Sequence, residues 1–240
     1  MLTKRRICVS IPIINTQSAN DKLESVLANI DTAIQKGADI VECRFDFLKD
    51  FDQIDHYIKI LSKYKDRCIY TLRPVNEGGH FSNEHIKRIH ILQKLIEAKP
   101  LFVDIEYELV SKNDEFADYL ENNNSRILVS WHDFAKTPLH DELLTIINKM
   151  RVYSPYLKIV TTAININDSI TMLKLYQSVD THVNLIAFAM GEAGTISRIL
   201  STIIGDSPFT YASLDAPIAP GQLSIDQMKV FEKLFESKLI

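Results

Sequence analysis

The sequence has little of several features that would assign it to a particular class of protein. It contains three cysteines in 240 residues (Cys8, Cys43 and Cys68), each within an apolar, strand-like run. An odd number of such thiols is typical of buried, reduced cysteines and argues against a disulfide framework or a cysteine-bound metal. Only seven glycines occur, with no GxGxxG sequence and no glycine-rich linker. We therefore expect one domain over residues 1–240 and no dinucleotide fingerprint.

Long apolar runs and an excess of positive charge are also missing. No segment approaches the ~20 apolar residues of a membrane span. The basic residues 4–6 precede an apolar run, but that run ends at Pro12 and is too short for an export signal. The net charge of −4 provides no basic surface for nucleic acid. The sequence predicts a cytoplasmic protein with neither a membrane nor a nucleic-acid partner.

The sequence does contain a regular alternation of strand-like and helix-like segments. Apolar, β-branched runs recur every 25 to 33 residues and begin near Ile7, Ile40, Cys68, Leu101, Arg126, Tyr156, Val183 and Phe209. Such continuous runs are typical of parallel strands covered on both faces. Segments with apolar residues at helical spacing lie between them; one such stripe is Ile86, Ile89, Leu92, Leu95 and Ile96.

Eight strand–helix units of this length predict an α/β protein with the (β/α)8 TIM-barrel fold. The alternative is a doubly wound open sheet, but the even spacing and the lack of GxGxxG favour a closed barrel. In a barrel, side chains two apart on a strand share a face, and the C-terminal strand ends meet at one mouth. Polar residues at those ends are therefore candidates for an active site.

Lys158 is the most informative of these candidates. It lies in the apolar run Tyr156–Val160, where an unpaired ammonium group is costly to bury. A desolvated lysine loses its proton more readily, and the neutral amine attacks carbonyl carbon. The preceding strand-like run ends at His132. Together they predict a Schiff-base enzyme with a histidine acid/base, the alternatives being a lysine that extends to solvent and an ordinary core histidine.

Other polar residues follow the predicted strands: Glu42, Arg44, Asp46, Arg73, Asp104, Glu106 and Ser130, with Glu77 and Arg198 in the segments after the third and seventh strands. Singly, each has an ordinary explanation, such as an ion pair between Glu42 and Arg44 or a solvated Arg198. Their convergence on one mouth favours a polar active site. The histidines have no ligand spacing, so no metal site is predicted.

In their order along the chain, these segments resemble the type I 3-dehydroquinate dehydratase family. The matching segments are Glu42–Asp46, Thr71–Arg73, Glu77–Gly79, Asp104–Glu106, Ser130–Phe134, Lys158, Met190–Gly191, Ser197–Arg198 and Ala219–Gln222. The resemblance extends from Ser10 to Gln222. Each segment alone is a weak signal, but the ordered set is specific.

The resemblance implies a TIM barrel that converts 3-dehydroquinate to 3-dehydroshikimate in the shikimate pathway of aromatic amino-acid biosynthesis, without metal or cofactor. By the family pattern, Lys158 forms an imine with the C3 ketone. His132 removes a C2 proton and helps the C1 hydroxyl leave, and Glu77 orients the histidine. The family is commonly dimeric, so the resemblance also implies a possible homodimer.

The resemblance further implies the substrate-binding residues, which are Ser10, Glu42, Arg44, Arg73, Arg198 and Gln222. Among them, Arg198 matches the residue that binds the substrate carboxylate. Gln222 lies in the loop 215–222, which is expected to close over the substrate. Many family members have a serine where this chain has Ile218, and that difference affects one hydrogen bond of this loop. Two other functions stay open: a class I aldolase, and a catalytically silent barrel that serves as a binding protein.

Overall fold

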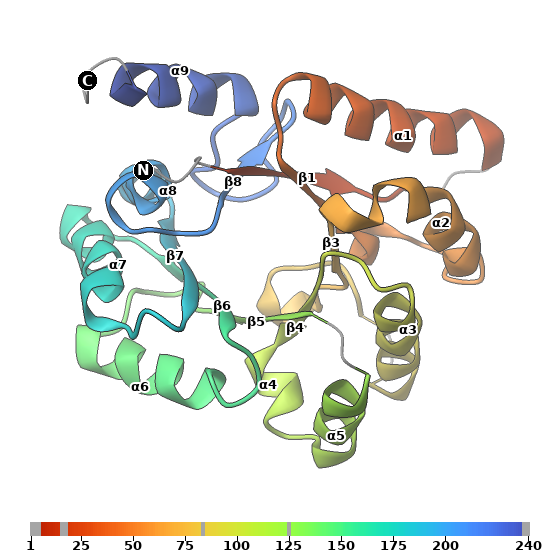
Figure 1. Cartoon of the computed structure of the whole chain (residues 1–240), viewed down its shortest axis with the longest axis horizontal. Coiled ribbons are helices and arrows are strands. Elements are labelled where there is room, and N and C mark those ends of the chain that lie inside the picture. Colours follow the sequence, from red (N-terminus) through yellow and green to blue (C-terminus); the bar gives the residue numbers. More distant parts are fainter. Residues whose placement is uncertain (1–5, 15–18, 83–84, 124–125, 237–240) are drawn as a thin grey trace.

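The strands form one parallel, eight-stranded barrel. The computed structural model describes residues 6–14, 19–82, 85–123 and 126–236, without side chains for 19–24 and 236. The strands are β1 (Ile7–Pro12), β2 (Ile40–Arg44), β3 (Cys68–Thr71), β4 (Phe102–Glu106), β5 (Ile127–His132), β6 (Tyr156–Thr162), β7 (Asn184–Met190) and β8 (Thr210–Ser213). Their order is β7-β6-β5-β4-β3-β2-β1-β8, so β7 and β8 are the two edges of a nearly closed barrel (Figure 1). The predicted (β/α)8 architecture is confirmed.

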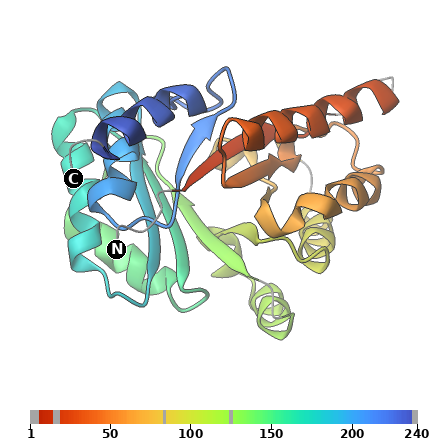
Figure 2. The ribbon, with the colours of Figure 1, turned by 45° about the horizontal axis from the view of Figure 1, so that its top comes forward.

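The helices surround the strands, as Figures 1 and 2 show. They are α1 (Ala19–Gln35), α2 (Ile54–Leu61), α3 (His85–Glu97), α4 (Tyr107–Val110), α5 (Asp114–Asn122), α6 (His140–Met150), α7 (Ile166–Ser178), α8 (Thr195–Ile204) and α9 (Ile225–Glu236). The first and last helices lie side by side, where Lys36 Nζ is 2.7 Å from Asp226 Oδ2. Within the described residues, no helix combines the length and apolar character needed to cross a membrane.

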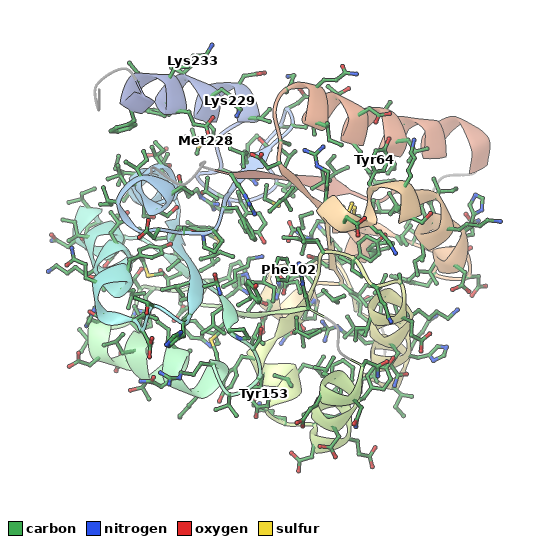
Figure 3. All side chains as sticks on the ribbon, viewed as in Figure 1. Tyr64, Phe102, Tyr153, Met228, Lys229 and Lys233 are labelled. Atoms are coloured by element: carbon green, nitrogen blue, oxygen red, sulfur yellow. The ribbon has the colours of Figure 1, made fainter. Side chains whose placement is uncertain are left out.

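Two buried layers follow from the alternation of side chains along each strand. One face of each strand packs against the helices, and the other points into the barrel. The apolar residues of the interior include Cys8, Ile40, Ile69, Phe102 and Leu128. Phe102 lies near the centre of the barrel in Figure 3 and packs edge-on against Tyr156, 4.7 Å between ring centroids. Because this layer fills the barrel interior, the inward polar residues nearer the C-terminal strand ends have an apolar floor beneath them.

All eight strands begin within one residue of the predicted positions. Strands β4, β5, β7 and β8 each begin one residue later than predicted. The last helix was predicted to begin at Ser224 and begins at Ile225, because Ser224 is its N-cap. Ser224 Oγ accepts a hydrogen bond from Gln227 N, and Gln227 Oε1 accepts one from Ser224 N. This reciprocal pair is a capping box, which satisfies amides that the first helical turn leaves free.

The buried stripe of α3 differs from the predicted one. Ile86 is 80% exposed, although the sequence places it in the apolar stripe. Arg88 is only 7% exposed and takes the buried position one turn before Leu92. Residues 88, 92, 95 and 96 share a helix face, so the stripe that contacts the barrel begins with a charged residue. An apolar pattern could not identify that position, because the residue there is an arginine.

The corrected stripe makes a prediction about stability. Leu92→Ala should lower the free energy of unfolding by ~2–5 kcal/mol, because it leaves a cavity in a fully buried site. Ile86→Ala, on the same helix, should change it by less than about 0.5 kcal/mol, since the side chain is mostly in solvent. Urea denaturation of both variants measures the difference. Equal destabilisation by the two substitutions would support the stripe predicted from sequence instead.

Candidate active site

A small pocket of about 110 Å³ lies at the C-terminal mouth of the barrel. All nine residues predicted as catalytic or substrate-binding line it: Ser10, Glu42, Arg44, Arg73, Glu77, His132, Lys158, Arg198 and Gln222. They come from strands β1, β2, β5 and β6 and from the segments after β3, β7 and β8. The structure therefore brings together residues that lie up to 212 positions apart in a chain of 240 residues.

Lys158 is buried inside the barrel but is not unpaired. Its side chain is on β6 and 6% of the residue is exposed. Nζ lies 3.0 Å from Asp104 Oδ2 and 3.5 Å from Glu42 Oε1. The ring of Tyr211 lies on another side, with its centroid 4.5 Å from Nζ. The cost of burying an unpaired ammonium group therefore does not arise here, because strands β2 and β4 each supply a carboxylate.

His132, at the end of β5, and Glu77, in the loop after β3, form a hydrogen-bonded pair. His132 Nδ1 is 3.0 Å from Glu77 Oε2. Burial lowers the pKa of His132 well below its usual value, and the nearby cations Arg73 and Lys158 lower it further. The imidazole is therefore neutral near neutrality. If Nδ1–H donates to the Glu77 carboxylate, Nε2 carries the free lone pair.

Burial acts on Glu77 in the opposite sense. It raises the pKa of Glu77 to about 7, although the Arg73 guanidinium works against this shift. Arg73 Nη1 donates to the same oxygen, Glu77 Oε2, at 3.1 Å. Near neutral pH a modest change in the surrounding charge therefore decides whether Glu77 is ionised.

A tight loop after β3 aims Glu77 at the histidine. Residues Val75–Glu77 form one turn of 3-10 helix, and Gly78 ends it with φ of +71°, a conformation that favours glycine. The chain then folds back so closely that a Cβ at Gly79 would lie 2.0 Å from Arg73 O. Any side chain at position 79 would push this loop outward. The glycine pair in the sequence is thus explained by the placement of Glu77.

Arg73 connects the residues of the pocket. Its guanidinium is buried and contacts four side chains: Nη2 donates to Asp104 Oδ1 at 2.6 Å, and Nη1 to Glu77, Glu106 and Ser130 at 2.9 to 3.1 Å. Burial would lower the pKa of Arg73, but the carboxylates raise it above its usual value. Burial alone would raise the pKa of Asp104, yet Arg73 and Lys158 lower it below its ordinary range. Both ions are therefore charged at neutral pH.

Glu42 and Arg44 do not form the ion pair that the sequence left open. Arg44 donates two hydrogen bonds to Asp46, both 2.8 Å, and this fork resembles a bidentate carboxylate pair. Glu42 accepts from Ser10 Oγ at 2.7 Å and from Thr71 Oγ1 at 3.0 Å. The two hydroxyl groups leave Glu42 pointing into the pocket beside Lys158.

Arg198 is a buried cation with no carboxylate partner in the described part of the chain. It is 2% exposed, and its guanidinium lies over the ring of Phe188, 4.2 Å from the centroid. Among the described residues, Nη2 donates only to Pro220 O, at 3.3 Å, and Nε has no partner. Burial lowers the pKa of Arg198 to about 9, so the side chain stays charged near neutrality. Such a group is a ready site for an anion.

The loop after β8 covers the pocket from above. Gln222 Oε1 accepts from Ile218 N at 3.0 Å, so the side chain braces its own loop. Gly191 N donates to Pro220 O at 3.2 Å, which ties the loop to the segment after β7. A Cβ at Gly221 would lie 2.2 Å from Gly191 O, so the close approach of the two segments requires glycine there. Ile218, Ala219 and Pro220 form part of the pocket wall.

Some pocket residues were missed by the sequence reasoning. Phe188, Met190 and Tyr211 line the pocket with the predicted residues. The alternation of side chains along a strand could have identified them, because residues 186, 188 and 190 of β7 all face the barrel interior. Apolar residues that form a wall have no chemistry to mark them in a sequence. Within the described ranges, no group of three or more His, Cys, Asp or Glu residues could hold a metal ion.

Comparison with known proteins identifies relatives of this chain. The chain is 34% identical to a 3-dehydroquinate dehydratase from Pyrococcus abyssi over 212 residues, which is 88% of this chain and 94% of that protein. It is also 34% identical to a protein of the same name from Methanococcus maripaludis over 233 residues, 94% of this chain and 99% of that protein. Among solved structures, the 3-dehydroquinate dehydratase of Geobacillus kaustophilus has the same fold. Its TM-score is 0.83 at 22% identity, over 98% of this chain and 93% of that one.

A family model agrees with these relatives. The model for type I 3-dehydroquinase matches residues 7–237, which includes every strand of the barrel and every residue of the pocket. The match therefore covers nearly the whole chain, and the resemblance noted in the sequence is confirmed. This chain belongs to the type I 3-dehydroquinase family.

Proposed function

We propose that this protein is a hydro-lyase that dehydrates 3-dehydroquinate to 3-dehydroshikimate through an imine on Lys158. One observation carries the proposal: a single pocket holds a buried amine, a neutral imidazole oriented by a carboxylate, and a guanidinium with no carboxylate partner among the described residues. These three groups suit a substrate that has a ketone, an acidic C–H bond beside it and a carboxylate. The family relationship supports the same activity, in the shikimate pathway. The cytoplasmic location and the homodimer stay predictions.

The imine is the centre of the proposed mechanism. A proton must leave the Lys158 ammonium before Nζ can attack C3, and Nε2 of His132 is a base that can accept it. Nζ adds to C3, and the former ketone oxygen takes one proton from Nζ and one back from the His132 imidazolium. It leaves as water to give an iminium ion, and His132 is neutral again. That ion withdraws electrons from the C2–H bond, so the carbanion formed by losing the proton is stabilised as an enamine.

His132 is proposed to carry the protons of the elimination. Nε2 takes the proton from C2, and Nδ1–H keeps its hydrogen bond to Glu77. The enamine electrons then expel the C1 hydroxyl, which takes a proton from the imidazolium and leaves as water. Hydrolysis of the remaining iminium releases 3-dehydroshikimate and frees Lys158. The histidine returns to its neutral form after each cycle.

The remaining pocket residues are proposed to bind the substrate. Arg198 provides the buried positive charge for the carboxylate, and its guanidinium fork suits a bidentate contact. Glu42, Arg44, Arg73 and Ser10 provide donors and acceptors around the ring hydroxyls. Gln222 reaches the substrate once the loop 215–222 settles over it, and Ile218 helps to exclude water.

The first prediction tests the imine. Borohydride added with 3-dehydroquinate should reduce the imine and leave a stable adduct on Lys158, found by intact mass and peptide mapping. Lys158→Ala should lose both adduct and turnover. Lys158→Arg should fare no better, because a guanidinium does not deprotonate to attack a ketone. Lys174→Ala, which changes an exposed lysine on α7, is the control. Substantial turnover by Lys158→Ala would refute the mechanism.

The second prediction concerns pH. The active state needs Glu77 ionised and His132 neutral, and both forms are favoured by higher pH. Because the pKa of Glu77 is raised to about 7 and that of His132 is lowered, Glu77 should limit the rate at acid pH. The value of kcat/KM should rise about ten-fold between pH 6 and pH 8. In Glu77→Gln, the acid limb of the kcat/KM profile should move to lower pH, and the maximum value of kcat/KM should be lower. If the acid limb of kcat/KM stays at the same pH in this variant, the ionisation that limits the rate belongs to another group.

The third prediction tests the anion site. Arg198→Ala should raise KM about ten- to a hundred-fold, the equivalent of ~1.5–3 kcal/mol for hydrogen bonds to a charged group. Arg198→Lys keeps the charge but loses the fork, so its KM should lie between the two. Arg126→Ala, which changes an exposed arginine just before β5 at the other end of the barrel, serves as the control. An unchanged KM in Arg198→Ala would place the carboxylate elsewhere, with Arg44 the next candidate.

A further inference from the structure

Arg88 is a buried cation that no step of the proposed reaction uses. It lies on the outer helix α3, yet only 7% of the residue is exposed. A buried arginine is costly unless its charge is compensated, and an apolar residue in this stripe would pack against the barrel without that cost. Its presence there needs an explanation in terms of its contacts.

Those contacts join two strands where their backbone pairing ends. The last rung of the β3–β4 ladder is Thr71 with Asp104. Beyond it, Arg88 Nη2 donates to Leu72 O at 2.8 Å and to Glu106 Oε2 at 2.5 Å. One guanidinium group therefore fixes the C-terminal ends of both strands, and these ends carry Arg73 and Glu106 into the site.

A continuous chain of ionic contacts leads from Arg88 to the histidine. The other oxygen of Glu106, Oε1, accepts from Arg73 Nη1 at 3.0 Å. The same Nη1 donates to Glu77 Oε2 at 3.1 Å, and that oxygen is 3.0 Å from His132 Nδ1. Arg88 is thus three side chains away from the imidazole, through Glu106, Arg73 and Glu77.

The balance of charge around Glu77 depends on Arg88. Three carboxylates (Glu77, Asp104 and Glu106) surround Arg73, and the cations that contact them are Arg73, Arg88 and Lys158. Without Arg88, three carboxylates would share two cations. Glu42 adds a further negative charge beside Lys158. On the outer side, Glu77 and Arg88 line a cleft of about 640 Å³, and its charged residues Glu108 and Lys112 pair with each other.

Glu77 is the carboxylate that a charge deficit would protonate first. Its pKa is raised to about 7 by burial, and Arg73 and Arg88 are the cations that lower it. The pKa of Asp104 lies below its ordinary range. Glu106 keeps Arg73 as a partner on its other oxygen. A neutral Glu77 would donate a hydrogen bond to His132 Nδ1 instead of accepting one from Nδ1–H, and the ring proton would then sit on Nε2.

We propose that Arg88 is a positioning residue for the acid/base pair: from outside the barrel it keeps Glu77 ionised and so keeps Nε2 of His132 free to accept a proton. It touches neither substrate nor reacting atoms. The inference rests on the proposed function only in taking Nε2 as the base. The tautomer of His132 in the substrate-free protein is a property of the site itself.

The experiment compares Arg88→Met, which removes the charge, with Arg88→Lys, which keeps it. Lys87→Met removes a cation from the neighbouring, exposed position of the same helix and is the matched control. Arg88→Met should move the acid limb of kcat/KM upward by ~1 unit or more, because it removes an opposite charge close to Glu77. Its activity should approach that of the parent protein at alkaline pH. Arg88→Lys and Lys87→Met should keep the parent midpoint.

A second readout needs no substrate. Nitrogen-15 NMR at about pH 7.5, between the two expected midpoints, should find the proton of His132 mainly on Nδ1 in the parent protein and mainly on Nε2 in Arg88→Met. A merely structural role would lower activity equally at every pH and leave the tautomer unchanged, and that result would overturn the proposal. So would an equal shift of the limb in Arg88→Lys. If Arg88→Met does not fold, by circular dichroism, Arg88→Gln tests the same loss of charge.

The two proposals can fail separately. Without a borohydride adduct on Lys158 in the parent protein, the proposed reaction fails, whatever Arg88 does. If the adduct forms but the uncharged Arg88 variants shift neither the acid limb of kcat/KM nor the His132 tautomer, the proposed reaction stands and the proposed role of Arg88 fails.

Discussion

The guanidinium of Arg73 is the interaction on which the rest of the site depends. It is 3% exposed and holds three carboxylates that come from β4 and from the loop after β3. Each of these carboxylates positions a further group: Asp104 holds Lys158, Glu77 holds His132, and Glu106 holds Arg88. A buried ionic network is stable only when each member has its partners, so these residues form one unit.

Arg73 and Arg198 are both buried, but their partners indicate different roles. Arg73 is surrounded by carboxylates, and its charge is used within the protein. Arg198 has a backbone carbonyl and an aromatic ring but no carboxylate in the described part of the chain. Within the described residues, these contacts recover only part of the free energy that its burial costs. An anionic substrate can recover the rest, which couples binding to the completion of the site.

Much of the fold could be predicted because it is periodic. The strands follow from apolar runs at regular intervals, and no strand begins more than one residue away from its predicted start. The prediction for α3 was wrong at Ile86 and missed Arg88, because the helix buries a charge that an apolar stripe does not reveal. The carboxylate partners of Lys158 were missed for a similar reason: they lie on strands far away in the chain.

The sequence by itself determined which residues face one mouth, because strand parity and the common direction of parallel strands leave no other arrangement once the barrel closes. It also carried the ordered motifs of the family. Only the tertiary structure decided which charge pairs with which: Arg44 with Asp46 rather than Glu42, and Arg198 with no carboxylate in the described chain. The physical reason is that the energy of an ion pair depends on distance across the barrel and on burial, and spacing along the chain measures neither.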